Sequence, residues 1–116
     1  MPVSYTPWMG SFTLTDTNAH QLLALLKALP AAQQPIAVSA SVPRCQYLII
    51  TNDIDNGGAK LYVGNSGVTT SFYGHKLVAS QFVPLYSVDA NLIRLDQIYL
   101  LTDTNPTVVT VSLLTR

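Results

Sequence analysis

The stretch Gly64–Val68, GNSGV, holds the residues whose types and spacing come nearest to a reactive site. A serine nucleophile needs a general base within reach and an acid that orients the base. The only upstream histidine is His20, inside a predicted helix, and His75 lies downstream of Ser66. The stretch does not fit G-x-S-x-G, and VTTSF after Gly67 favours a strand over the helix that a phosphate loop requires. We interpret it as a turn between strands and expect no catalytic residue and no enzyme activity.

A second candidate is NDIDNGG, residues 52–58, because Asp53 and Asp55 have the spacing that opens a calcium-binding loop. Gly64 stands where that loop requires a glutamate, and the flanking residues favour strands rather than helices. A hairpin turn at Asn56-Gly57 explains the same residues. Cys45 is the single cysteine, so no disulfide forms within the chain, and no zinc-type Cys/His spacing occurs. We expect neither a metal nor another cofactor.

The surface is expected to be wetted by hydroxyl and amide groups, because charged residues make up only 10% of the chain and the net charge is zero. Lysines and arginines are scattered, which argues against nucleic acid as a partner. The longest leucine-rich run, LLALLKAL, is too short to span a bilayer and contains Lys27, so no membrane is expected. Weak repulsion between copies permits close association, and we expect a homo-oligomer.

Residues 1–11 are predicted to form an extended N-terminal arm, stiffened by two prolines, ahead of a single domain at 12–116. The arm is rich in large apolar side chains, which either pack on the domain itself or dock on a neighbouring subunit. The docking residues of the second interpretation are Tyr5, Trp8, Met9 and Phe12. A leucine stripe at helical spacing, ended by Pro30, predicts one α-helix at about 17–29.

The rest of the chain reads as short strands separated by turn signals. The predicted strands are 12–15, 36–42, 45–51, 60–64, 68–72, 81–87, 97–102 and 107–114, with a short helical turn within 88–97. Residues 45–51 are apolar on both faces, which predicts a central strand that is covered on both sides. The fold class is therefore mainly β, an antiparallel β-sandwich or a jelly-roll-like barrel with one short N-terminal helix.

The second half of the chain resembles small β-rich structural proteins of tailed bacteriophages. Such proteins commonly show an apolar strand that ends in Asn, followed by Tyr-Val-Gly, Val-Thr, Gly-x-x-Leu, an Ile-Tyr strand and a last Val-rich strand. The matching residues are Asn52, Tyr62-Val63-Gly64, Val68-Thr69, Gly74 to Leu77, Ile98-Tyr99 and Val108 to Val111. Where the family often has Gly after the aliphatic Leu, this chain has Ala79-Ser80.

The resemblance implies a virion structural protein, most simply a capsid decoration (cement) protein, and it favours a trimer as the homo-oligomer. Its partners would be the major capsid protein or other virion proteins, and it would be found in the virion, after assembly in the host cytoplasm. A tail, neck or fibre subunit shows the same pattern and remains an alternative. A carbohydrate-binding module is an alternative of another class, because sandwiches bind sugars through exposed aromatic residues, here Tyr73, Phe72 or Trp8.

Overall fold

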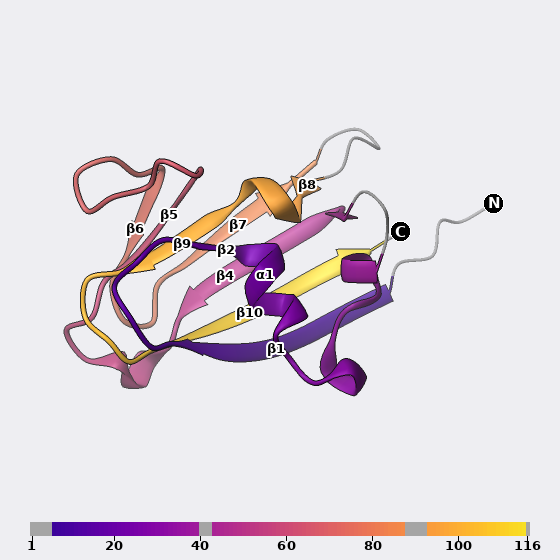
Figure 1. Cartoon of the computed structure of the whole chain (residues 1–116), viewed down its shortest axis with the longest axis horizontal. Coiled ribbons are helices and arrows are strands. Elements are labelled where there is room, and N and C mark those ends of the chain that lie inside the picture. Colours follow the sequence, from indigo (N-terminus) through magenta and orange to yellow (C-terminus); the bar gives the residue numbers. More distant parts are fainter. Residues whose placement is uncertain (1–5, 40–42, 88–92, 116) are drawn as a thin grey trace.

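The computed structural model describes residues 6–39, 43–87 and 93–115, and its architecture is mainly β and antiparallel (Figure 1). Sheet A has the order β1 (Thr6–Leu14), β10 (Thr107–Thr115), β4 (Tyr47–Asn52), β7 (Phe82–Tyr86). Sheet B has the order β2 (His20–Gln21), β9 (Tyr99–Thr102), β5 (Leu61–Gly64), β6 (His75–Leu77). A short ladder joins β3 (Arg44–Cys45) to β8 (Ile93–Arg94).

One hydrophobic core joins the two sheets. Alternate residues of β4 and β10 are fully buried and form the inner face of sheet A, as the two-residue period of a strand dictates. They pack with Leu61 and Val63 of β5 and with Leu100 of β9. Leu22 and Leu26 of the helix α1 (Leu22–Lys27) complete this core, and α1 lies on the inner side of sheet A (Figure 1). The prediction of an antiparallel, mainly β chain with one helix is confirmed.

The helix is shorter than the predicted range 17–29, and α1 begins only at Leu22. The residues before it are held by sheet B: His20 and Gln21 pair with β9, and the Gln21 amide donates to the Asp96 carbonyl oxygen. Asp16 accepts hydrogen bonds from the Asn18 N–H and from the His20 ring, which closes a turn instead of a first helical turn. These contacts with sheet B are worth more than the weak local preference for another helical turn.

Three other predicted elements differ. Residues 36–39 form the 3₁₀-helix η2 (Ile36–Ser39) instead of a strand, and 40–42 lie outside the described residues. Residues 68–72 form a loop. The 52–58 segment contains the 3₁₀-helix η3 (Ile54–Asn56) and leads from sheet A to sheet B, so it is not a hairpin. Within 88–97, the described part holds the 3₁₀-helix η4 (Leu95–Gln97).

The predicted boundary between arm and domain, at residue 11, falls inside β1. Residues 6–14 pair with β10 along their whole length and form an edge of sheet A. Trp8 is half-buried, and its ring N–H donates to the carbonyl oxygen of Gln33 at 2.9 Å, in the 3₁₀-helix η1 (Ala31–Gln33). Phe12 also packs against the core. Residues 6–11 are therefore part of the folded body, and Tyr5 lies outside the described residues.

Candidate interaction surface

The outer face of sheet A is built by strand alternation, and its residues line up in rows across the four strands. The pairing register gives three complete rows: Pro7, Leu114, Tyr47 and Tyr86; Met9, Ser112, Ile49 and Pro84; Ser11, Thr110, Thr51 and Phe82. A fourth, partial row pairs Thr13 with Val108. These residues define what we call the outer face. It contains no charged side chain, and its apolar side chains gather in the first two rows.

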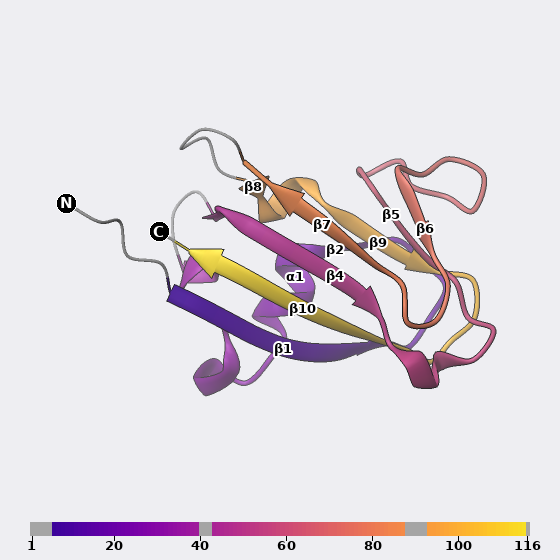
Figure 2. The same ribbon diagram turned by 180° about the vertical axis from the view of Figure 1, so that it is seen from behind.

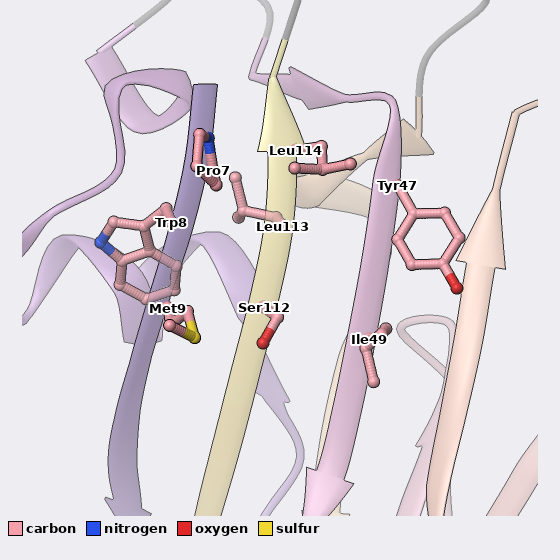
Figure 3. Close-up of a pocket in the computed structure, with 8 residues that line it drawn as sticks. All are labelled: Pro7, Trp8, Met9, Tyr47, Ile49, Ser112, Leu113 and Leu114. Carbon is pink, nitrogen blue, oxygen red and sulfur yellow. The ribbon is translucent and has the colours of Figure 1, made fainter. Parts of the chain in front are cut away.

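This face is open along its length. Met9, Tyr86 and Phe82 at the two edges are 79%, 67% and 60% exposed, and the residues of the two central strands are partly buried. Figure 2 shows β1, β10, β4 and β7 in front, with α1 behind them. A shallow apolar hollow of about 280 Å³ lies over the first two rows, lined by Met9, Ile49, Tyr47 and Leu114 among others (Figure 3). Antiparallel sheets that face water usually carry polar side chains there, so an apolar open face indicates a binding surface.

The outer face of sheet B is different, because the chain covers part of it. Tyr62 of β5 and Leu101 of β9 point away from the main core and form a second buried cluster with Val68. Val68 belongs to the loop 65–74 between β5 and β6, and it is only 4% exposed. Gly64 permits this approach, since a Cβ there would lie 3.2 Å from a Val68 methyl group. The GNSGV stretch thus belongs to a covering loop.

Ser66 sits exposed at the turn of this loop. The Asn65 side-chain oxygen accepts the Gly67 N–H, and the Val68 N–H donates to the Asn65 carbonyl oxygen, which closes the turn. His75 is exposed on β6. The loop also presents two exposed aromatic residues, Phe72 and Tyr73, beside a hollow of about 210 Å³. Among the described residues, Ser66 has no hydrogen bond to a base, and the turn is formed by backbone and amide groups.

Among the described residues, the acidic, basic and thiol side chains lie away from the outer face. Asp53 accepts the Asp55 N–H and caps η3, which accounts for the pair considered for calcium. Burial raises the pKa of the Cys45 thiol to about 12, so this thiol is unreactive near neutral pH. The Asn18 N–H and the His20 ring lower the pKa of the Asp16 carboxyl group. The described residues contain no group of three His, Cys, Asp or Glu side chains placed to hold a metal ion.

The predicted docking residues are divided between the two faces of β1. Met9 lies on the outer face, whereas Trp8 and Phe12 point inward and contact the protein itself. Most of the outer face was not singled out from the sequence, above all Tyr47, Ile49 and Leu114. The signal for them was present: β4 and β10 carry apolar residues at both parities, although only one parity enters the core.

Comparisons with protein-family models, with curated proteins and with solved structures found no match. Within residues 6–39, 43–87 and 93–115, no helix is long and apolar enough to cross a membrane.

Proposed function

We propose that this chain is a structural subunit of a bacteriophage virion, and specifically a decoration protein that stabilises the capsid by binding between capsomers. The observation that carries the proposal is the open, apolar and uncharged outer face of sheet A, which suits a subunit held among other protein surfaces. The resemblance of residues 45–115 to phage structural proteins supplies the setting. The domain is a β-sandwich in this proposal, with two sheets around one core.

Such a protein acts by binding and performs no chemistry. A decoration protein attaches to a preformed lattice, and symmetry-related copies add many weak contacts into a stable attachment. Association of subunits with one another multiplies these contacts. The low charge of the subunit favours binding, because few of its charged groups lose their hydration at the interface. Of the predicted docking residues, Met9 lies on the outer face, and Tyr5 lies outside the described residues.

The location of the chain in the particle tests this function. Virus particles that carry the chain would be disassembled into heads and tails, and each fraction would be analysed by mass spectrometry. We expect the chain in the head fraction, at a fixed ratio to the major capsid protein. Recovery with tails alone would refute the decoration function and favour the tail, neck or fibre alternative.

A truncation test of the arm has to respect the fold. Removal of residues 1–11 would delete the part of β1 before Phe12, residues 6–11, and expose its partner β10. Removal of residues 1–5 leaves β1 whole. We expect the 1–5 truncation to keep the far-ultraviolet circular dichroism spectrum and to reduce incorporation into heads, and undiminished incorporation would refute a docking role for Tyr5.

Carbohydrate binding is the second candidate, and one observation favours it. Phe72 and Tyr73 are both exposed and line a hollow together with Asn65, and aromatic rings beside a polar side chain suit a sugar ring. Trp8 does not serve this role, since its ring N–H is bound to Gln33. A glycan array probed with wild type and with Phe72→Ala would support this function if binding were lost in the variant.

A further inference from the structure

We propose that the outer face of sheet A binds the same face of a second copy of this chain, so that two subunits form a face-to-face pair. This inference rests on the proposed role of the outer face in binding protein, and it names the partner. It concerns the isolated chain, so its test needs no virus particle.

The outer face of sheet A has the residues of a covered surface, but no part of the described chain covers it. Ile49 is flanked across the sheet by Ser112 and Pro84, and Tyr47 is flanked by Leu114 and Tyr86. A strand with apolar residues at both parities is typical of a layer packed on both sides. The chain supplies one cover, formed by sheet B and α1, and for sheet B it also supplies the loop 65–74. The described residues supply no such cover for the outer face of sheet A.

The lack of charge on the outer face restricts the chemistry of its partner. A partner surface with charged groups would lose their hydration on this face and find no opposite charge in return. The best partner is therefore also uncharged and apolar with some hydroxyl groups. The outer face itself has this composition, and pairing two copies brings no like charges together.

The two edges of sheet A are poorly suited to the addition of another strand. The two edge strands, β1 and β7, carry Pro7 and Pro84, which have no N–H to donate to an added strand. The β1 edge is also approached by η1 through the Trp8–Gln33 hydrogen bond. Association through the face is therefore favoured over extension of the sheet.

The geometry allows a symmetric pair. A two-fold axis parallel to the strands, between β10 and β4, places β10 opposite β4 of the partner and keeps each row opposite itself. The aromatic first row then meets its own copy, with Leu114 opposite Tyr47, and Ser112 meets Ile49. Sheets stack about 10 Å apart with a modest twist between them.

The area is sufficient. With strands about 4.8 Å apart and about 3.3 Å of rise per residue, four strands and three to four rows give roughly 400–500 Å² of flat area per copy. Protruding side chains add accessible area, so a pair buries on the order of 1,000–1,600 Å² in total, which lies above the lower limit of about 1,000 Å² for a biological interface.

The main test is the oligomeric state of the purified full chain, measured by sedimentation equilibrium over a concentration series. We expect a dimer for wild type. Ile49→Lys places an unpaired charge in the interface and should raise the dissociation constant at least about 100-fold. The matched control is Ile54→Lys, because Ile54 is 72% exposed in η3 and outside the outer face, and it should remain dimeric. A monomeric or trimeric wild type, or equal weakening by Ile54→Lys, would overturn the pair.

Two further variants protect the test from misfolding. Met9→Lys changes an edge side chain that is already exposed, so it should fold and still weaken the dimer. Ser112→Cys places a thiol near the two-fold axis, while native Cys45 is buried and silent. A short bismaleimide should crosslink two Ser112→Cys subunits and leave Ser66→Cys, on the exposed loop, as monomer. Equal crosslinking of both variants would refute the arrangement.

Discussion

Asn52, at the end of β4, is a buried polar residue on which both sheets depend. Its side-chain N–H₂ group donates to the carbonyl oxygens of Ala59 and Leu77, at 2.9 and 2.8 Å, and its oxygen accepts from the Asn56 amide. The residue is fully buried, so no water replaces these partners. It thereby fastens β4 of sheet A to the segment before β5 and to β6 of sheet B.

Asn52→Leu tests this role with a side chain of similar size. Each of the two buried carbonyl oxygens that lose their donor costs about 1–3 kcal/mol, and the lost bond from Asn56 costs about 1 kcal/mol. The burial of leucine offsets about 1–2 kcal/mol. We expect a net loss of about 3 kcal/mol, a large part of the total stability of about 5–15 kcal/mol for such a domain. Urea unfolding should show a lower midpoint with an unchanged slope.

The control is Gln81→Leu. Gln81 is an exposed amide whose side chain accepts one bond, from the Val78 N–H, so its loss should cost less than about 1 kcal/mol. A loss below about 1 kcal/mol for Asn52→Leu, or equal losses for the two variants, would refute the reasoning. Asn52→Leu combined with Asn56→Ala should cost less than the sum of the single changes, because the two amides bind each other.

Three further changes test the packing of the chain. A Cβ on Gly10 would lie 2.6 Å from the Trp8 ring, so Gly10→Ala should lower the free energy of unfolding by roughly 2 kcal/mol, measured by thermal unfolding. The loss should be smaller when Trp8 is already replaced by alanine. Ser80 has a φ of 70°, so Ser80→Val should cost about 1–3 kcal/mol in chemical unfolding, whereas Ser80→Gly should cost nothing. Because the folded-state pKa of Cys45 is raised to about 12, its contribution to stability is complete below the unfolded pKa of about 9 and is lost as the pH rises toward 12. Urea midpoints between pH 8 and 11 should therefore fall more steeply for wild type than for Cys45→Ala.

The sequence predicted most strands because alternation and turn residues are local signals. The predicted strands at 45–51, 60–64, 81–87, 97–102 and 107–114 are confirmed within a few residues by β4, β5, β7, β9 and β10. The helix could be located but not delimited, since its start depends on the pairing of His20 and Gln21 with β9, which is distant in sequence.

Alternation of apolar and polar residues, or strand-forming residue types, predicted strands at two places where the segment has no partner strand. Residues 36–39 alternate in hydrophobicity, yet they follow Pro35 and close a 3₁₀ turn in which the Val38 N–H donates to the Pro35 carbonyl oxygen. Residues 68–72 are rich in strand-forming types, but the Thr69 hydroxyl oxygen accepts hydrogen bonds from the N–H groups of Ser71 and Phe72. These bonds close the segment into a loop. Val68 is buried there because it covers Tyr62, not because it lies in a sheet.

The apolar pattern of residues 45–51 predicts a strand that is covered on both faces, and the fold covers only the inner one. Leu48 and Ile50 are fully buried, whereas Tyr47 and Ile49 are only partly buried. The pattern and the fold agree if the second cover comes from outside the chain. Leaving this face in water would expose adjoining apolar side chains across four strands, which monomeric proteins rarely do. The sequence of β4 is therefore the sequence of an interior strand, and its interior is completed when a second uncharged sheet closes over Ile49.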